Sequence, residues 1–461
     1  MKRFCLFLAL MLALCIPALA VPIENAESSC RVWIDGAEAL VYETAVCNQR
    51  YWTANPELSS APVAIAQAQG SCRVEAEFLN AQVHSAVVRP LSLGVVPEIA
   101  DGKVCFTLPA PAKCTVEING DTAGALHLFV DAPDADKPDP DAANVQYFGP
   151  GVHTNVLITA KSNQTIYIDA GAIVYGQIFC GMGSNFTIAG HGVLCGSIYD
   201  RYADTIVPVS ITNAHDFTIR DITILDPSAW TVNLYKCKNA VIDNVKIIGA
   251  RSNSDGITMQ NVENVLVQNC FVRSWDDNLV VKGYNGNVDG VTCRNCILWT
   301  DLAQSCEIGY ETRAQFIRNI TFEDITVLHS FHKPVISIHN SDSAAVSQVA
   351  FRNITVEDAR MGAGDGTPYL IDLTTTKSQW SVTSRRGTID QVSIQHVSVL
   401  SGNRPVIRIW SDSAEAPIDH VTIDQLEYQG ETIEDFDQVV YEASPYNGPD
   451  IRLQGVSAPG L

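Results

Sequence analysis

The sequence predicts an all-β protein in which a small β-sandwich precedes a parallel β-helix. Two features predict this architecture. Apolar and polar residues alternate in the first part of the chain, and a strand motif repeats through the second part. No amphipathic helical pattern separates the repeated strands, which argues against a leucine-rich repeat with its regular leucines and helical segments.

The repeated motif is a short strand of alternating apolar residues with Asp or Asn near its middle. Successive central residues lie 23 to 29 positions apart, and weaker copies surround His396 and Gln425. A period of this length, made of β-branched strands, indicates the coils of a β-helix, each buried only by its neighbours. The central residues are Asp221, Asn244, Asn269, Asn295, Asp324 and Asn353.

Four Asn-x-Thr sequons, which could accept N-linked glycans, fall in or beside the predicted strands. We interpret them mostly as part of the strand composition, and their glycosylation would depend on the cell that makes the protein. They begin at Asn163, Asn185, Asn319 and Asn353.

The first 20 residues predict export from the cell. Lys2 and Arg3 precede an apolar run, and Ala18-Leu19-Ala20 forms a cleavage site, so residues 1–20 are predicted to be a signal peptide removed after Ala20. We expect a secreted or periplasmic protein. No later stretch is apolar enough to span a membrane, so we expect the mature protein to be soluble.

The mature chain is predicted to consist of a sandwich at residues 21–130, a linker at 131–144 and the β-helix, with any catalytic function, at 145–461. The linker combines three prolines with acidic residues, which predicts an exposed connector. The sandwich could bind sugar or pack against the β-helix. We favour packing, because Trp33 and Trp52 suit a core as well as a sugar platform.

The charge of the chain narrows the classes of partner. The full chain has a net charge of −21, and loss of Lys2 and Arg3 makes it −23. Such a surface repels anions and argues against nucleic acid, although a local basic subsite is compatible with it. We expect a monomer with no membrane, metal or cofactor partner.

The cysteines predict disulfides, because 12 of the 14 would remain in an exported chain once Cys5 and Cys15 are removed. Pairings do not follow from the spacing, and Cys180 with Cys195 is the preferred bridge. Cys293 and Cys296 form a C-x-x-C pair within a strand pattern. No second pair stands at zinc-finger spacing, so we interpret them as core or disulfide cysteines.

Two acidic segments stand out from the repeat and carry the candidate chemistry. Asn253-Ser-Asp-Gly and Trp275-Asp-Asp-Asn place Asp255 and the doublet Asp276-Asp277 about one coil apart, at 21 positions from Asp255 to Asp276. Neighbouring coils stack at about 4.8 Å, so the three carboxyl groups would converge. Asp-Gly and Asp-Asn also mark turns, but the spacing, the doublet and the flanking Trp275 favour a catalytic site.

These residues resemble those of a known group of enzymes. Asn253-Ser-Asp-Gly followed by Asp276-Asp277 and Lys282 is similar to the polygalacturonases of glycoside hydrolase family 28, which are right-handed parallel β-helices. The Gly-His-Gly and Arg-x-Lys segments that normally follow are absent. The region around Glu307-Ile-Gly-Tyr310 is more similar to the dextranase and isopullulanase family 49, which carries a β-sandwich ahead of its β-helix. Gly190-His191-Gly192 lies several coils earlier and is interpreted as a turn.

The resemblance implies an inverting glycoside hydrolase. Asp276 would protonate the glycosidic oxygen, while Asp255 and Asp277 would activate a water, as the separation of acid and base in inverting enzymes requires. Aromatic side chains near the same coil position could stack on sugar faces, and a subsite histidine could come from His329, His332 or His339. The expected substrate contacts are Lys282, Glu307, Tyr310, Arg313, Trp275 and Trp230.

The favoured substrate is a neutral α-linked polysaccharide of the dextran or pullulan type. A pectic polyuronate is the first alternative, supported by Lys282, Arg313, His332 and Lys333. A β-helix that binds glycan without cleaving it is the second. A polysaccharide lyase is a weaker possibility, because it would typically need calcium and a basic residue, whereas three carboxylates suit hydrolysis.

Overall fold

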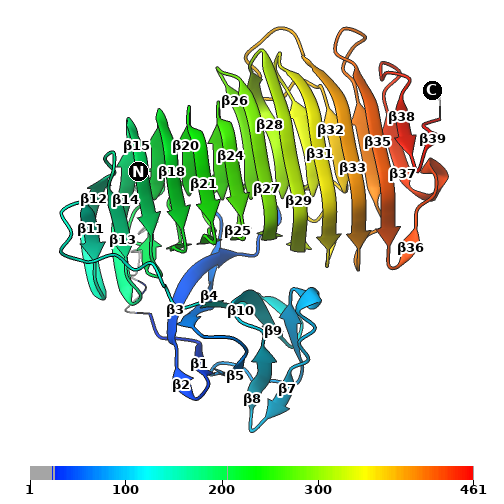
Figure 1. The fold of residues 1–461 in the computed structure, drawn as a ribbon. Coiled ribbons are helices and arrows are strands. Elements are labelled where there is room, and N and C mark those ends of the chain that lie inside the picture. The colour runs from blue at the N-terminus through cyan, green and yellow to red at the C-terminus, as the bar shows by residue number, and fades with distance from the viewer. Residues whose placement is uncertain (1–22, 24–25, 205, 460–461) are drawn as a thin grey trace, which may run out of the picture.

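The computed structural model describes residue 23, residues 26–204 and residues 206–459. Within this part of the chain there is no α-helix, and two β units lie against each other (Figure 1). The sandwich, β1 to β10, packs along one side of the much longer β-helix, β11 to β39. The predicted signal peptide lies outside the described residues.

The sandwich consists of two five-stranded sheets with an apolar core between them. The alternation seen in the sequence places Cys72, Val74 and Ala76 of β5 in this core, while the residues between them face outward. The first sheet runs β2 (Ala37–Glu38), β1 (Cys30–Ile34), β5 (Cys72–Phe78), β8 (Lys103–Leu108) and β7 (Glu98–Ala100). The second runs β3 (Leu40–Cys47), β4 (Leu58–Gln67), β10 (Asp121–Asp131), β9 (Ala112–Ile118) and β6 (Ala86–Arg89). The short helix η2 (Leu91–Leu93) follows β6.

The β-helix is a right-handed parallel β-helix whose coils form three parallel ladders. The first ladder consists of β11 (Val145–Phe148), β13 (Thr165–Ile168), β15 (Gly183–Ala189), β18 (Ala214–Arg220), β21 (Lys238–Asp243), β24 (Glu263–Gln268), the first parts of β27 (Val288–Thr300), β29 (Phe316–Ser330), β31 (Ala345–Val356), β33 (Thr388–Val399) and β35 (Ile418–Tyr428), and β38 (Ile451–Leu453).

The second ladder consists of β12 (Gly151–Thr159), the start of β14 (Ala172–Cys180), β16 (Val193–Cys195), β19 (Thr223–Leu225), β22 (Lys246–Ile248), β25 (Phe271–Ser274) and the second parts of β27, β29, β31, β33 and β35. The third consists of the end of β14, β17 (Val209–Thr212), β20 (Val232–Tyr235), β23 (Ile257–Gln260), β26 (Leu279–Tyr284), β28 (Cys306–Arg313), β30 (Ile336–Asn340), β32 (Ile371–Thr374), β34 (Val406–Trp410) and β37 (Val440–Ala443). The C-terminal end adds β36 (Glu431–Thr432), η3 (Phe436–Gln438) and β39 (Val456–Ser457).

The polar residue of each repeat lies at the corner between the first and second ladders. All six central residues have a positive φ, from 51° at Asn295 to 69° at Asp221. Asn and Asp tolerate this left-handed conformation better than other residues with a Cβ. Their side chains also bond from coil to coil, as in the 2.9 Å contact from Asn244 Nδ2 to Asp221 Oδ1. The repeat therefore marks a bend, not the middle of a straight strand.

A second row of left-handed residues lies near the start of the first ladder and includes three of the sequon asparagines. Asn185 Nδ2 donates to Asn163 Oδ1 at 2.8 Å, and Asn319 Nδ2 donates to Asp289 Oδ1 at 2.6 Å. At the other corner, Asn353 Nδ2 donates to Asp324 Oδ1 at 3.0 Å. The four sequon asparagines are therefore part of the coil-to-coil pattern, as the sequence predicted.

The sandwich covers the outer face of the second ladder, which confirms that it packs against the β-helix. Outward-facing Ile248, Phe271 and Trp299 form one buried cluster with Val63 and Phe129 of the sandwich. Because side chains alternate along a strand, the inward residues of the same ladder, such as Ile247 and Val272, fill the interior of the β-helix instead.

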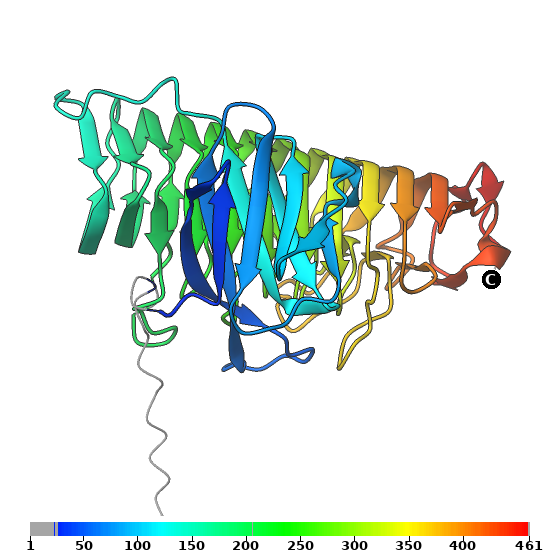
Figure 2. The ribbon, with the colours of Figure 1, turned by 90° about the horizontal axis from the view of Figure 1, so that it is seen from below.

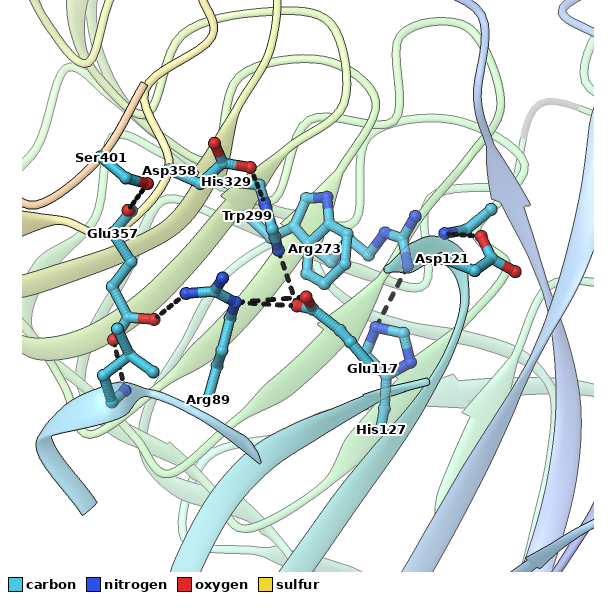
Figure 3. A network of polar contacts seen from close by, with 12 residues as sticks. Arg89, Glu117, Asp121, His127, Arg273, Trp299, His329, Glu357, Asp358 and Ser401 are labelled. Atoms are coloured by element: carbon cyan, nitrogen blue, oxygen red, sulfur yellow. Dashed lines mark hydrogen bonds and ion pairs between the residues drawn. The ribbon is translucent and has the colours of Figure 1, made fainter. Parts of the chain in front are cut away.

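Buried charges also join the two units (Figure 3). Glu117 of β9 lies 2.7 Å from His329 Nε2 and 3.1 Å from Arg89 Nε, and Arg89 continues to Glu357 at 2.8 Å. Further along, Arg273 of β25 lies 3.3 Å from His127 Nε2 of β10 and pairs with Asp301 of the β-helix, and both members of this pair are at most 1% exposed. Buried charges need such partners, so the contact between the units is fixed in position.

The predicted linker is mostly exposed, as expected from the sequence, but it is also held to the β-helix at several points. Asp131 is only 3% exposed and is paired with Lys246 and His191. Asp134 accepts a hydrogen bond from the Tyr167 hydroxyl at 2.7 Å. The acidic residues of this segment therefore find donors on the coils beside them, which composition alone does not reveal. Gly190-His191-Gly192 connects β15 to β16 and is a turn, as predicted.

The cysteines differ from the expectation as well. None of the twelve in the described residues forms a disulfide, and all are buried. The preferred bridge was wrong, because Cys180 faces the interior of the β-helix whereas Cys195 faces the sandwich. Cys293 and Cys296 lie in the core of the β-helix, as predicted.

Candidate active site

The three predicted aspartates lie where the chain passes from the second ladder to the third. Asp255 precedes β23, and Asp276 and Asp277 precede β26 on the next coil. Backbone bonds hold these two connections in register: Gly256 N donates to the Asp277 carbonyl at 2.7 Å, and Ile257 N to the Asn278 carbonyl at 2.8 Å. The coil spacing inferred from the sequence therefore brings the three residues together.

The aspartates lie in a cleft of about 370 Å³ that both units line. Asp255 and Asp277 are buried at its base, at 2% and 6% exposed, whereas Asp276 is partly exposed to it. The other lining residues are Trp52, Arg201, Trp230, Asn253, Lys282, Leu302, Ala303, Gln304, Tyr310, Glu311, Lys333, Gln379 and Trp380.

Each carboxyl group has a defined environment. Asp277 Oδ1 accepts from the backbone N–H of Gln304 at 3.1 Å, and Asp276 Oδ1 accepts from the backbone N–H of Asp277 at 3.1 Å. Lys282 Nζ lies 3.8 Å from Asp255 Oδ2 and 3.2 Å from Glu311 Oε2. Lys282 therefore lies close to Asp255 and Glu311, and the charges of Asp276 and Asp277 also act on it.

The cleft raises the pKa of all three aspartates. Burial and then the charge of Asp276 hold the pKa values of Asp255 and Asp277 well above the ordinary range. Burial also raises the pKa of Asp276, but Lys282 and Lys333 oppose the shift. Burial alone would lower the pKa of Lys282, yet Asp255 and Glu311 raise it above its usual value. The triad therefore retains a proton at pH values where isolated aspartates are ionised, and its members titrate together.

This electrostatic strain predicts that Asp255→Asn stabilises the protein at pH 7. The pKa of Asp255 is higher in the folded than in the unfolded chain, so the folded state binds more protons and stability falls as pH rises from about 4. Asn cannot ionise and escapes this loss, on the order of 1 kcal/mol for each unit by which the pKa is raised. Thermal unfolding of both proteins at pH 4 and pH 7 measures the effect.

Asp101→Asn is the matched control for this comparison. Asp101 lies in an exposed sandwich turn with a φ of 50°, which Asn also accommodates. Its melting temperature should follow that of the wild type at both pH values. If the melting temperature of Asp255→Asn relative to the wild type is no higher at pH 7 than at pH 4, folding does not raise the pKa of Asp255.

Tyr310 lines the cleft, but Glu307 does not, which corrects the prediction of a Glu307 substrate contact. Glu307 is fully buried and lies 2.9 Å from Nδ1 of His339, on the next coil of the third ladder. The Tyr310 ring stacks on His339 at 4.3 Å, and its hydroxyl accepts from Gln304 Nε2 at 3.1 Å. Burial would lower the pKa of His339, but Glu307 and Asp372 raise it to about 10. A charged imidazolium therefore supports the tyrosine.

The remaining predicted contacts divide into those at the cleft and those away from it. Trp230 lines the cleft, with Lys282 Nζ 5.7 Å from its ring centre. Trp275 is fully buried between the β-helix and Cys47 of β3, so it was wrongly expected to meet substrate. Arg313 is not among the lining residues and stacks on Tyr284 at 4.1 Å. A register shift between β26 and β28 turns the preceding Tyr310 and Glu311 to the cleft instead.

None of the three candidate histidines lines the cleft. His329 lies in the buried network between the two units, and His339 lies beneath Tyr310. His332 Nδ1 lies 2.8 Å from the Leu302 carbonyl oxygen, and its Nε2 lies 2.6 Å from Asp365. His332 and His339 therefore contact residues that line the cleft, Leu302 and Tyr310, whereas His329 does not. Among the described residues, no group of three or more His, Cys, Asp or Glu side chains is arranged to hold a metal ion.

Two cleft tryptophans were not among the site residues predicted from the sequence: Trp52 was considered as a sugar platform but packing was favoured, and Trp380 was not considered. Trp52 and Trp380 are 59% and 51% exposed, although most large apolar side chains here are buried. Trp380 lies in the connection between β32 and β33. Its coil is unusually long, with 43 positions from Asn353 to His396 against 29 from Asp324 to Asn353. In the sequence, this extra length is the signal that the coil carries a long loop, the loop in which Trp380 lies.

A β-helix with a cleft in which acidic side chains gather across adjacent coils carries the groups that hydrolysis of a glycosidic bond uses. Sequence comparison agrees with the geometry. The chain belongs to the family described as glycosyl hydrolases family 28, whose model matches residues 205–435. The match covers half of the chain and includes all three aspartates.

Curated relatives are distant and are matched over only part of their length. Isopullulanase from Aspergillus niger is 27% identical over 216 residues, which is 41% of this chain and 37% of the relative. Exopolygalacturonase from Zea mays is 24% identical over 271 residues, which is 53% of this chain and 62% of the relative. The chain thus spans less than two thirds of these relatives.

Among solved structures, Dex49A from Penicillium minioluteum has the same fold. The TM-score is 0.62 at 16% sequence identity, with 90% of this chain and 93% of that one covered. A likeness at this identity shows the architecture and not the activity. No helix in the described part of the chain is long and apolar enough to cross a membrane.

Proposed function

We propose that the protein is a secreted, monomeric, inverting glycoside hydrolase that cleaves an α-linked polysaccharide with Asp255, Asp276 and Asp277. The observation that carries the proposal is the arrangement of these residues on two adjacent coils, with Asp276 open to the cleft and the other two buried below it. This arrangement matches the division of labour in inverting hydrolysis, in which one carboxylic acid protonates the leaving oxygen and carboxylate activates a water.

In the proposed reaction, Asp276 donates its proton to the glycosidic oxygen as the bond to the anomeric carbon breaks. Asp255 and Asp277 hold a water on the opposite face of the sugar and accept its proton as the oxygen bonds to the anomeric carbon. Inversion requires the acid and base to lie roughly 6.5–9.5 Å apart in order to leave room for this water.

Substrate binding accounts for the position of the proton. In the free protein, the pKa values of buried Asp255 and Asp277 are raised more than that of Asp276. A sugar ring that covers Asp276 removes water from the most exposed carboxyl of the three and raises its pKa further. We infer that the shared proton then moves to Asp276, and that Lys282 keeps Asp255 ionised.

The favoured substrate is a neutral glucan of the dextran or pullulan type. Trp230 and Trp380 offer aromatic faces to the apolar faces of sugar rings in the cleft. The similarity to isopullulanase from Aspergillus niger supports the same class of substrate.

A polyuronate is the second candidate, because two cleft cations lack a carboxylate partner. Lys333 and Arg201 both line the cleft, and neither is ion-paired within the described residues. The Arg201 guanidinium donates instead to the Ser252 carbonyl oxygen and to Asn253 Oδ1. Either cation could meet the carboxylate of a uronic acid.

A screen on dextran, pullulan and polygalacturonate, with NMR of the first product, tests the proposal. We expect reducing sugar from one of the two glucans, and a first product whose anomeric proton shows the β configuration, because an inverting enzyme reverses an α linkage. Activity on polygalacturonate alone would show that the substrate is a polyuronate and not a neutral glucan. An α product would contradict the assigned mechanism.

A further inference from the structure

We propose that Trp52 of the sandwich is a sugar-binding platform, and that the two units therefore build the substrate cleft jointly. The proposal rests on the proposed function and extends it to a part of the molecule outside the matched family region, residues 205–435. Its ligand is a sugar ring of the polysaccharide chain, held by stacking on the indole.

Trp52 lies in the loop between β3 and β4, residues 48–57, which we name the sandwich loop. Figure 2 shows this loop reaching the same side of the β-helix as the long loops that precede β33. Trp52 lines the cleft with the three aspartates and remains 59% exposed. An exposed indole at the wall of a polar cleft offers a flat apolar face to the C–H groups of a sugar.

Contacts before Trp52 fix one side of the sandwich loop. The Arg50 guanidinium lies 4.1 Å from the centre of the Phe331 ring and donates to the Asp301 carbonyl oxygen at 3.3 Å. The Arg50 carbonyl accepts from the backbone N–H of Asp365 at 3.2 Å. The chain entering Trp52 is thus bound to two separate coils of the β-helix.

Contacts after Trp52 fix the other side. The Ala54 carbonyl oxygen accepts from the Tyr202 hydroxyl at 2.7 Å and from the Ser252 hydroxyl at 2.8 Å. Ser252 directly precedes Asn253 of the first acidic segment. The Trp52 N–H also donates to Asp365 Oδ2 at 3.4 Å, so the backbone that carries the indole is held before substrate arrives, which reduces the entropy lost on binding.

The position of Trp52 has a consequence for the substrate. Trp230 lies just before β20, and Trp380 lies in the long connection after β32, so the two line the cleft from different coils. Trp52 approaches from the second-ladder side instead. A chain of several sugars can meet all three tryptophans at once, so we infer that Trp52 contributes most to the binding of long substrates.

The test compares Trp52→Ala, Trp52→Phe and Tyr51→Ala. Tyr51 is the matched control, because it is 50% exposed in the same loop but does not line the cleft. Kinetics are measured on dextran, pullulan and polygalacturonate and on a trisaccharide of each. Trp52→Ala should raise KM for the cleaved polymer about tenfold, with little change on its trisaccharide. Trp52→Phe should restore most of the loss, and Tyr51→Ala should match the wild type.

Retardation in gels that contain each of the three polysaccharides separates this inference from the proposed function. If the wild type is retarded but cleaves none of the three polysaccharides, the proposed hydrolase activity is overturned. The Trp52 platform is then supported, provided that Trp52→Ala abolishes the retardation. If the wild type cleaves a polysaccharide and Trp52→Ala has the same KM and the same retardation, the Trp52 platform is overturned and the hydrolase activity is not. Melting temperatures within 2 °C of each other, on the order expected for a surface change, show that the variants are folded.

Discussion

Replacing Asp276 by Asn is expected to lower kcat by about 10³-fold while the protein still binds polysaccharide, because general acid catalysis contributes roughly 10²–10⁴-fold. Asn has nearly the same shape as Asp, so contacts with the substrate remain, but the amide cannot give a proton to the leaving oxygen. The backbone bond from Asp277 N to Oδ1 can also be retained by the amide oxygen. Initial rates on the cleaved polysaccharide measure the loss, and gel retardation measures binding.

The Asp101→Asn variant serves again as the control for the Asp-to-Asn change itself. It should keep the wild-type kcat, because Asp101 lies in an exposed sandwich turn away from the cleft. An Asp276→Asn protein within tenfold of the wild type would remove Asp276 from the role of proton donor. Loss of retardation together with rate would indicate instead that the substitution disturbs the cleft.

Replacing Arg273 by Met is expected to destabilise the protein by about 3–5 kcal/mol, the usual cost of removing one member of a buried ion pair. Arg273 and Asp301 are both shielded from solvent, and the Arg273 guanidinium also lies 4.0 Å from the centre of the Trp299 ring. Met fills part of the space but leaves Asp301 with Arg50 at 3.7 Å as its nearest cation. Urea denaturation of both proteins gives the difference.

Arg318→Met provides the comparison for Arg273→Met. Arg318 pairs with Asp289 at 2.7 Å, but these side chains are 44% and 31% exposed, so loss of the pair should cost about 1 kcal/mol or less. The double variant Arg273→Met with Asp301→Asn should recover part of the stability, since the buried charge is removed. Equal effects of the two single Met substitutions would contradict the importance of the buried pair.

The coils and the aspartate triad could be predicted because both follow from distances along the chain. Asn and Asp recur once per coil because the left-handed corner favours them, and the two acidic segments lie about one coil apart, at 21 positions. Contacts across the second ladder did not follow in the same way. Phe271 and Val272 are both apolar, yet one faces the sandwich and the other the interior of the β-helix. Local pattern cannot distinguish these two environments.

The same limit explains the errors at the site. Trp275 flanks an aspartate in the sequence, but its side chain is enclosed where β3 meets the β-helix. Trp52 lies more than 200 positions before the aspartates, and only the docking of the sandwich brings it to the cleft. The buried pair Glu307 and His339 likewise depends on which way a side chain turns from a strand whose register shifts at this point. Such features depend on contacts between residues far apart in the chain.

The left-handed corners also separate the parts of this protein that can change length from those that cannot. Each corner sets where the second-ladder strand of its coil begins, so an inserted residue there would shift the side chains of that strand to the wrong face. The connections that follow the second and third ladders have no such duty, and the longest coil extends in both of them, at residues 357–370 and 375–387. Lengthening a flexible loop twofold costs only about 0.6 kcal/mol. Transplanting loops at this rim is therefore a practical way to redesign the range of sugars accepted while the scaffold stays intact.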